Sequence, residues 1–261
     1  MKARIRLADA DVAVDLSHAI SIARELDFAD NSPQHFDAPA ATSQPYAAAG
    51  FSGSVATGAS CNCNVITVIP HCNGTHTECV GHLTREAVDA HRVVPTGLLP
   101  ALLISVSPVL ASDTNETTEP APQPNDLLIT REALESQWPA SAFAPQALVL
   151  RTDRGARPAA YLTRQAAQLL VERAIDHLVI DLPSIDRDHD AGRLSAHRIF
   201  FGLARGENRL SAANRPHATV TELAHIPSTL ADGPYLLQLQ VPAWRGDAVP
   251  SRPLLYAFRQ A

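Results

Sequence analysis

The sequence lacks the features of a membrane-spanning, secreted or nucleic-acid-binding protein. The longest apolar run, residues 98–106, contains Pro100 and is much shorter than the roughly 20 residues of a membrane span. No continuous apolar region follows the basic N-terminal residues, so we expect no secretory signal. The formal net charge is -6 and the pI is about 6.0, which leaves no basic surface for a phosphate backbone or an anionic membrane. We therefore expect no nucleic-acid partner and no membrane partner.

Cysteine is scarce and confined to one short segment, at Cys61, Cys63, Cys72 and Cys79. Extracellular scaffolds spread their cysteines to tie distant loops together, so this clustering indicates a reducing, cytoplasmic setting. The spacing also lacks the paired C-x₂₋₄-C knuckles of a structural zinc site. We expect small buried residues near the site and no disulfide.

The length and composition fit one large globular domain over residues 1–261. The chain is 46% apolar and 18% charged, and it has no repeat and no dividing linker. Residues 32–60, rich in Ala, Ser and Pro, show little periodicity and are expected to form an irregular arm. Such arms often cover a site or a subunit boundary, and we expect a homo-oligomer, a dimer or a tetramer. Residues 112–126 are predicted to form a surface loop.

Strand-like segments outnumber helical ones. Two helices are predicted, over 130–138 and 163–174, each opening with a threonine cap. The α/β alternation with few helices excludes a TIM barrel and predicts an α/β fold with a β-rich, barrel-like core and helices packed outside. The predicted strands are 12–16, 65–69, 99–106, 147–151, 178–181, 219–223 and 235–241.

The segment from Pro70 to Leu83, PHCNGTHTECVGHL, concentrates the residues that carry chemistry. It holds His71, His76, Glu78 and His82 directly after an apolar strand. His76 and Glu78 are two positions apart, so an extended chain places both side chains on one face. Imidazole with carboxylate suits Zn²⁺, Mn²⁺ or Fe²⁺ better than Ca²⁺ or Mg²⁺. Isolated histidines are usually structural, but this clustering favours a metal site.

This segment resembles the hallmark run of the cyclase family of metal-dependent hydrolases, which includes bacterial kynurenine formamidases and isatin hydrolase. Three further blocks are similar to the family in order and spacing: VDLSHAI at 14–20, VIDLPSID at 179–186, and LSAHRIF with the later TVTELAHI. The chain differs from the family run by one extra residue between His71 and Gly74, by Glu78 in place of Asp, and by Val80 in place of Pro.

The resemblance implies a site assembled from both halves of the chain. It implies that His71, His76 and Glu78 form the first metal cluster, that His197 and Glu222 complete it, and that His82 transfers protons. Because of the extra residue, either His71 or Cys72 could face the metal. One or two divalent ions, Zn²⁺ or Mn²⁺, are expected. For Ser184 and Asp186, which lack a nucleophile-elbow motif, we expect packing or a hydrogen bond to a metal ligand.

The expected function is hydrolysis of an amide in a small molecule, namely an N-formyl aryl amine, a lactam or a related cyclic amide, by metal-activated water. Two alternatives stay open. The altered run also fits a metal-free family member that acts as a binding or structural protein. His-x-Glu followed by a distant His also resembles the site of a cupin-type metal oxygenase.

Overall fold

The computed structural model describes residues 1–7, 10–28, 33–140, 143–152 and 159–259. The chain forms two compact units, one of Met1–Arg24 with Thr75–Ala261 and the other of Glu25–Gly74. In the described part of the chain, no helix is both long enough and apolar enough to cross a membrane.

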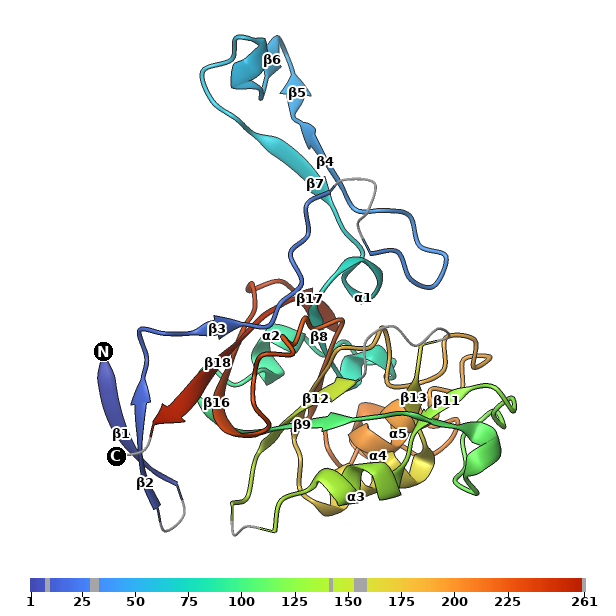
Figure 1. Ribbon diagram of the computed structural model, residues 1–261. Helices are drawn as coiled ribbons and strands as arrows, with labels where there is room; N and C mark the ends of the chain where they lie inside the picture. Colours follow the sequence, from blue (N-terminus) through green and yellow to red (C-terminus); the bar gives the residue numbers. More distant parts are fainter. Residues whose placement is uncertain (8–9, 29–32, 141–142, 153–158, 260–261) are drawn as a thin grey trace. The chain divides into compact units, whose positions relative to one another are not determined.

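The larger unit is built on an 11-stranded mixed sheet with strand order β1-β2-β18-β16-β9-β12-β14-β15-β8-β17, in which β3 also pairs with β18 (Figure 1). Its strands are β1 (Lys2–Leu7), β2 (Ala10–Asp15), β3 (Ile20–Ser21), β8 (His76–Cys79), β9 (Leu99–Val106), β12 (Ala147–Thr152), β14 (His177–Ile180), β15 (Thr219–Glu222), β16 (Gly233–Gln240), β17 (Ala248–Pro250) and β18 (Arg252–Arg259). Four central strands, β9, β12, β14 and β15, run parallel, and β8 is antiparallel to β15.

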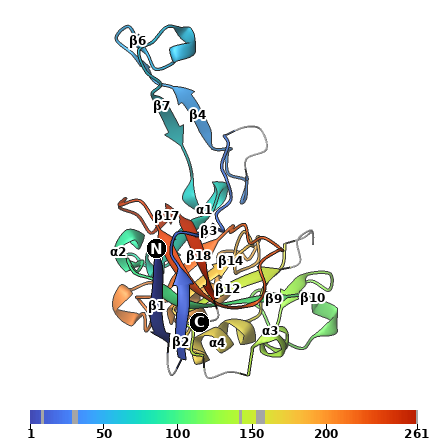
Figure 2. The same cartoon turned by 60° about the vertical axis from the view of Figure 1, so that its left-hand side comes forward.

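Both faces of the central strands are buried, which explains their nearly continuous apolar sequences. Leu102 and Ile104 of β9 join one core cluster with residues of the helices, while Ala101 and Leu103 point into a second cluster on the opposite face. The helices are α2 (Ala90–Val93), α3 (Arg131–Gln137), α4 (Arg164–Glu172) and α5 (Ser195–Phe201). Figures 1 and 2 show α3 and α4 side by side along the sheet.

The α/β prediction is confirmed, and several elements match closely. Strand 99–106 has the predicted bounds, and α3 and α4 begin after Thr130 and Thr163, whose hydroxyls accept hydrogen bonds from Ala133 N and Ala166 N. The described sheet is open, however, because its outermost strands β1 and β17 do not pair with each other. The barrel-like closure expected from the sequence is therefore not formed in this part of the chain.

A three-stranded sheet of β10 (Val109–Leu110), β11 (Leu127–Ile129) and β13 (Tyr161–Leu162) completes the larger unit. Residues 112–126 contain the end of the 3-10 helix η3 (Ala111–Asp113) and no strand.

The smaller unit contains two antiparallel strand pairs, β4 (Thr42–Pro45) with β7 (Asn64–Thr67) and β5 (Ala47–Ala48) with β6 (Phe51–Ser52). It also contains the 3-10 helix η1 (Val55–Thr57) and the short helix α1 (Pro70–Asn73). Residues 32–60 were expected to be irregular, but their described part contains β4, β5 and β6, since backbone pairing needs no apolar periodicity.

Candidate metal centre

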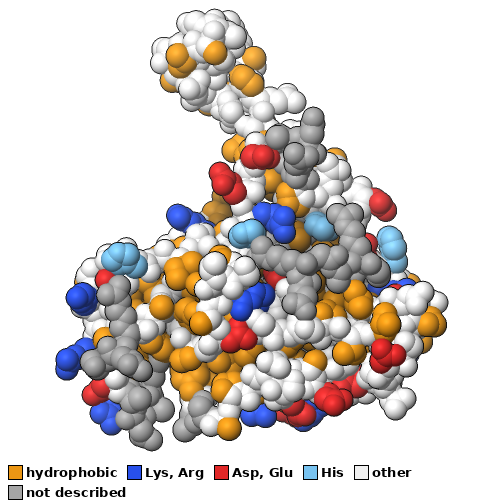
Figure 3. Space-filling model, viewed as in Figure 1, with side chains coloured by type: hydrophobic (Ala, Val, Ile, Leu, Met, Phe, Trp, Pro, Cys, Tyr) orange, Lys and Arg blue, Asp and Glu red, His pale blue; other side chains and the backbone are white. Residues whose placement is uncertain are grey.

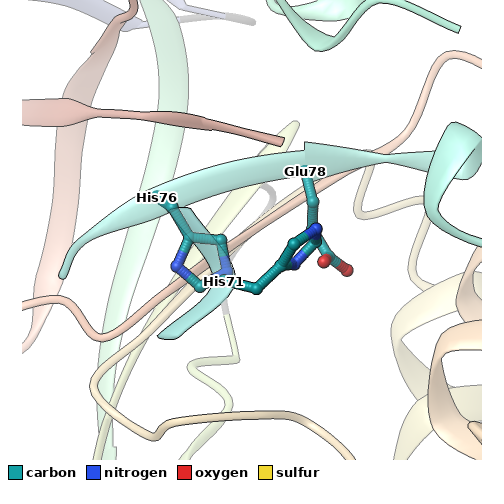
Figure 4. Close-up of side chains that lie close together, drawn as sticks. All are labelled: His71, His76 and Glu78. Carbon is teal, nitrogen blue, oxygen red and sulfur yellow. The ribbon is translucent and has the colours of Figure 1, made fainter. Parts of the chain in front are cut away.

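The register between β8 and β15 brings three of the predicted ligands onto one face of the sheet. Glu222 lies directly opposite His76, and Glu78 lies opposite Val220, so His76, Glu78 and Glu222 share that face. His76 Nε2 lies 3.5 Å from Glu222 Oε2, and all three side chains are buried. Figure 4 shows His76 and Glu78 projecting from the same side of β8. The period-two spacing read from the sequence is therefore realised in the strand.

His197 reaches this cluster from α5, more than a hundred residues further along the chain. Its ring nitrogen Nε2 lies 2.7 Å from Glu78 Oε1 and 3.4 Å from Glu222 Oε1. One ligand atom from each of Glu78, His197 and Glu222 lies within 4.8 Å of the others. Within the larger unit, the structure thus brings together the predicted ligands His76, Glu78, His197 and Glu222.

Asp186 holds His197 in place from the opposite side of the ring. Its carboxylate lies 2.7 Å from His197 Nδ1 and accepts hydrogen bonds from the backbone N–H groups of Ala196 and His197. Nδ1–H therefore donates to Asp186, and this tautomer leaves the lone pair of Nε2 directed at Glu78 and Glu222. A carboxylate behind a histidine ligand is the usual support of a metal-binding imidazole. The hydrogen bond expected for Asp186 is present.

The donor set of the cluster fits a divalent cation. Among the described residues, no hydrogen bond of good geometry reaches the buried Nε2 of His197, although a carboxylate oxygen lies 2.7 Å away. A lone pair and the oxygens of two buried carboxylates directed at one point repel each other unless a positive charge lies between them. A mixed set of imidazole nitrogen and carboxylate oxygen suits divalent transition-metal ions.

The pKa shifts of two groups in the cluster reflect the same excess of negative charge. Burial lowers the pKa of His197, but the charge of Glu78 and the close contacts with Asp186, Glu222 and Glu78 raise it well above its usual range. Burial raises the pKa of Glu222, yet its close contacts with His197 and His76 lower it overall. The negative charge of Glu222 is therefore balanced by a positive charge in the cluster, either a proton on His197 or a metal ion.

The backbone next to Glu222 is strained and is held in place by hydrogen bonds. Leu223 has a positive φ of 55°, which is unfavourable for a leucine. Its N–H donates to the carbonyl of Leu182, and its carbonyl accepts from the hydroxyl of Thr75 at 2.7 Å. Glu222 in turn accepts a hydrogen bond from Ile185 N at 2.8 Å. These contacts fix the carboxylate toward the cluster, and neither Thr75 nor Leu223 was identified from the sequence.

His82 lies at the border of the cluster rather than inside it. It ends the 3-10 helix η2 (Val80–His82), which turns the chain away after β8. Its Nδ1 lies 3.9 Å from Glu78 Oε2 and 3.4 Å from Asp247 Oδ2, and its side chain is 26% exposed. A solvent-accessible imidazole beside a buried carboxylate can exchange protons with a substrate. Asp247 was missed, because it lies 165 residues away in the sequence.

A cavity of about 400 Å³ lies beside this border residue. Its lining includes Gly81, Val88, Asp89, Arg245 and Asp247. Its volume falls in the range of small-molecule sites, roughly 300–1,000 Å³. Neither His82 nor a residue of the cluster belongs to this lining, so the cavity by itself does not mark the substrate site.

His71 and Cys72 belong to α1 in the smaller unit, where Cys72 is buried. Participation of either residue in metal binding stays a prediction.

All four cysteines are free thiols, as expected, but Cys61 and Cys63 are exposed rather than buried. Cys79 occupies the face of β8 opposite to Glu78, and burial raises the pKa of its thiol to about 12. Its Sγ donates to Val88 O instead of facing the cluster.

Comparison with known proteins assigns the chain to a family. The family model described as putative cyclase matches residues 14–187, two thirds of the chain. The chain belongs to the cyclase family. The match includes β8 with His76 and Glu78 and ends just after Asp186. None of the curated proteins matches the sequence.

Solved structures similar to this cyclase-family chain share its fold at low sequence identity. A predicted metal-dependent hydrolase from Bacillus stearothermophilus is 15% identical with a TM-score of 0.57, covering 92% of this chain and 98% of the other. Isatin hydrolase A from Labrenzia aggregata is 14% identical with a TM-score of 0.56, covering 92% and 93%. Isatin hydrolase A from Ralstonia solanacearum is 16% identical with a TM-score of 0.56, covering 92% of each chain. These likenesses establish the fold over nearly the whole chain.

Proposed function

We propose that this protein is a metal-dependent amidohydrolase that cleaves an amide of a small molecule. The observation that carries the proposal is the convergence of His197 Nε2 with the carboxylates of Glu78 and Glu222, held by Asp186. Membership of the cyclase family and a fold like that of isatin hydrolase support a hydrolase.

The ligands of the metal would be His76, Glu78, His197 and Glu222, with His71 as a fifth. When bound, a divalent ion supplies an activated water at neutral pH and polarises the scissile carbonyl. Asp186 keeps the lone pair of His197 Nε2 directed at the ion, and Ile185 N orients the carboxylate of Glu222. One or two ions of Zn²⁺ or Mn²⁺ fit this donor set.

His82 is proposed as the proton-transfer residue. Its imidazole takes a proton during attack of water on the carbonyl and returns it to the leaving nitrogen. Its position beside Glu78 and its partial exposure would let it contact both the cluster and a substrate that approaches from solvent. The substrate class is an N-formyl aryl amine, a lactam or a related cyclic amide.

The test is hydrolysis of a panel of formamides, lactams and lactones by protein loaded with Zn²⁺ or Mn²⁺, with loss of activity on chelation. Hydrolysis that proceeds without oxygen separates this proposal from a metal oxygenase, which would consume oxygen instead. Protein that binds metal but hydrolyses no member of the panel would contradict the substrate class. Protein without metal affinity would contradict the whole proposal and favour a binding role.

A further inference from the structure

The contact between His82 and Asp247 joins the border of the metal centre to the residue that precedes β17. His82 Nδ1 lies 3.4 Å from Asp247 Oδ2, within hydrogen-bond distance, and 3.9 Å from Glu78 Oε2, beyond that distance. Of these two carboxylates, Asp247 is therefore the one that accepts a proton carried on Nδ1. The His82 and Asp247 side chains are 26% and 42% exposed, so a small molecule can approach the pair from solvent.

An exposed carboxylate beside a histidine is common on protein surfaces and contributes little to stability. Asp and Glu side chains are spread over the surface shown in Figure 3, and several of them lie beside Lys or Arg. Proximity alone therefore assigns no role to Asp247. Two further observations set it apart, namely how its backbone is fixed and how closely it packs against the turn of His82.

The backbone around Asp247 is fixed by hydrogen bonds on two sides. Its carbonyl accepts from Cys79 N at 3.0 Å, and the carbonyl of the preceding residue accepts from Ala90 N at 2.7 Å. The next residue, Ala248, lies directly opposite Glu78 in the pairing of β17 with β8. The carboxylate of Asp247 is thus carried at the start of a paired strand rather than by a free loop. Such support holds a side chain in a defined position.

The turn that carries His82 packs directly against Asp247. A Cβ at Gly81 would lie 3.1 Å from the Asp247 Cβ and 2.7 Å from the backbone oxygen of Val88. A residue without a side chain at this position allows the two segments to approach so closely. The distance between His82 and Asp247 therefore depends on close packing of the backbone and not only on the choice of two exposed rotamers.

The other imidazole beside the cluster has the same kind of support. Asp186 lies 2.7 Å from Nδ1 of His197, and the rings of His197 and His82 are 5.7 Å apart. A carboxylate that accepts from Nδ1–H fixes the tautomer in which Nε2 carries the lone pair. In a histidine that transfers protons, this tautomer keeps Nε2 ready to take a proton.

We propose that Asp247 is the positioning residue of His82, which holds Nδ1–H so that Nε2 presents its lone pair for proton transfer. This inference rests on the proposed role of His82 in amide hydrolysis. Nε2 takes the proton of the attacking water and gives it to the leaving nitrogen, while the proton on Nδ1 stays in place. The carboxylate of Asp247 is therefore not protonated at any step, and it acts only through His82.

Steady-state kinetics of Zn²⁺-loaded variants test this proposal with the amide that the wild type hydrolyses fastest. In Asp247→Ala, kcat should fall by roughly 10- to 100-fold, a part of the ~10²- to 10⁴-fold that a positioned acid or base contributes. KM and zinc content should stay at the wild-type values. Asp247→Asn keeps an acceptor oxygen and should lose less.

The matched control is Asp89→Ala. Asp89 lines the same cavity as Asp247, but its carboxylate lies 3.4 Å from Arg92 and makes no side-chain cap to α2. This variant should keep the wild-type kcat. Circular dichroism of each variant checks that the fold is retained.

The nitrogen-15 spectrum of the neutral His82 ring supplies a readout that does not depend on activity. In the Zn²⁺-loaded wild type, we expect a proton on Nδ1 and none on Nε2. In Asp247→Ala, the tautomer with the proton on Nε2 should appear. The His82 signals are assigned by their loss in His82→Ala.

Several results would overturn the proposal. An unchanged tautomer or an unchanged kcat in Asp247→Ala removes the positioning role. A raised KM with unchanged kcat makes Asp247 a substrate-binding residue, and loss of zinc makes it part of the metal site. An equal loss of kcat in Asp89→Ala assigns the effect to the charge of the cavity. A wild type that hydrolyses no amide contradicts the proposed function instead, and the nitrogen-15 spectrum then decides by itself whether Asp247 fixes the ring.

Discussion

Asp186 and His197 are joined by a hydrogen bond of 2.7 Å between a carboxylate oxygen and Nδ1, inside a fully buried cluster. The same carboxylate accepts the first N–H groups of α5, so one side chain fixes both the position of the helix and the tautomer of the ring. The free lone pair of Nε2 is then directed at Glu78 and Glu222. The geometry of a proposed metal ligand is thus set by a residue outside the proposed ligand set.

Asp186→Asn should therefore weaken metal binding without removing any ligand. The asparagine oxygen can still accept from Ala196 N, but the amide N–H₂ replaces the oxygen that accepts from His197 N and Nδ1, which favours the tautomer with the proton on Nε2. We expect metal affinity to fall by roughly 10- to 100-fold, the usual effect of losing such a support. Titration with Zn²⁺ or Mn²⁺ in a calorimeter measures the change.

The control for this variant is Asp176→Asn, which alters a carboxylate bound to Arg215 and His217 outside the cluster. It should leave metal affinity unchanged. Equal affinities for the wild type and Asp186→Asn would show that the tautomer of His197 does not govern binding.

Replacement of His82 and His76 by alanine should separate proton transfer from metal binding. His82→Ala should keep nearly all bound metal and lose roughly 10²- to 10⁴-fold in turnover, the usual contribution of a positioned acid or base. His76→Ala should lose metal and activity together, because its ring is buried beside Glu222. Metal content and kcat are measured on the same preparations.

If His82→Ala empties the site as completely as His76→Ala does, His82 is a ligand and the proton-transfer group lies elsewhere. Full activity in His82→Ala would exclude both roles.

His177 should make the protein sensitive to mild acid. Burial lowers the pKa of this histidine from 6.5 to about 4, and its Nδ1 contacts the Thr219 hydroxyl at 2.9 Å. The unfolded state therefore binds more protons below pH 6.5, so this contribution to stability is complete above 6.5 and is lost as pH falls toward 4. Between pH 7 and pH 5 the free energy of unfolding should drop by about 2 kcal/mol from this group.

His177→Gln removes the titrating ring while keeping a polar partner for Thr219, and it should flatten that pH dependence in urea unfolding. The control His217→Gln changes an exposed histidine nearby and should retain it. An equally steep fall in His177→Gln would assign the acid sensitivity to other groups.

Gly81→Ala should disturb the turn that presents His82. A Cβ at this position would lie 2.7 Å from the backbone oxygen of Val88 and 3.1 Å from the Asp247 side chain. We expect a loss of about 1–3 kcal/mol in the free energy of unfolding, with reduced turnover. The matched substitution Gly97→Ala meets no atom within 4 Å and should cost far less. Thermal unfolding of both variants gives the comparison, and equal melting temperatures would contradict it.

The strands and helices with strong local signals were predictable from the sequence. The apolar run of β9 and the threonine caps of α3 and α4 are properties of neighbouring residues, and they appear in the structure at the expected places. The short helix α5 was missed because its N-cap is Leu194, which has no capping side chain, and Asp186 caps it from another segment. Strand β18 was missed because Pro253 interrupts its pattern.

The same distinction between local and tertiary effects applies to the candidate site. The shared face of His76 and Glu78 follows from the two-residue period of a strand and needs no tertiary information. The approach of Glu222 depends on the pairing of β15 with β8, and that of His197 on the packing of α5. Both were anticipated through the family resemblance rather than through spacing. The contact between His82 and Asp247 depends on a turn near the C-terminus and had no signal in the sequence.

Metal content tests the central claim most directly. Protein dialysed against Zn²⁺ or Mn²⁺ and then against metal-free buffer should retain one or two ions per chain by elemental analysis. A Glu78→Gln, Glu222→Gln double variant, which removes both buried negative charges but keeps the side-chain volume, should retain essentially none. A wild-type protein without bound ion, or a double variant that retains as much metal as the wild type, would contradict the assignment of this cluster as a metal centre.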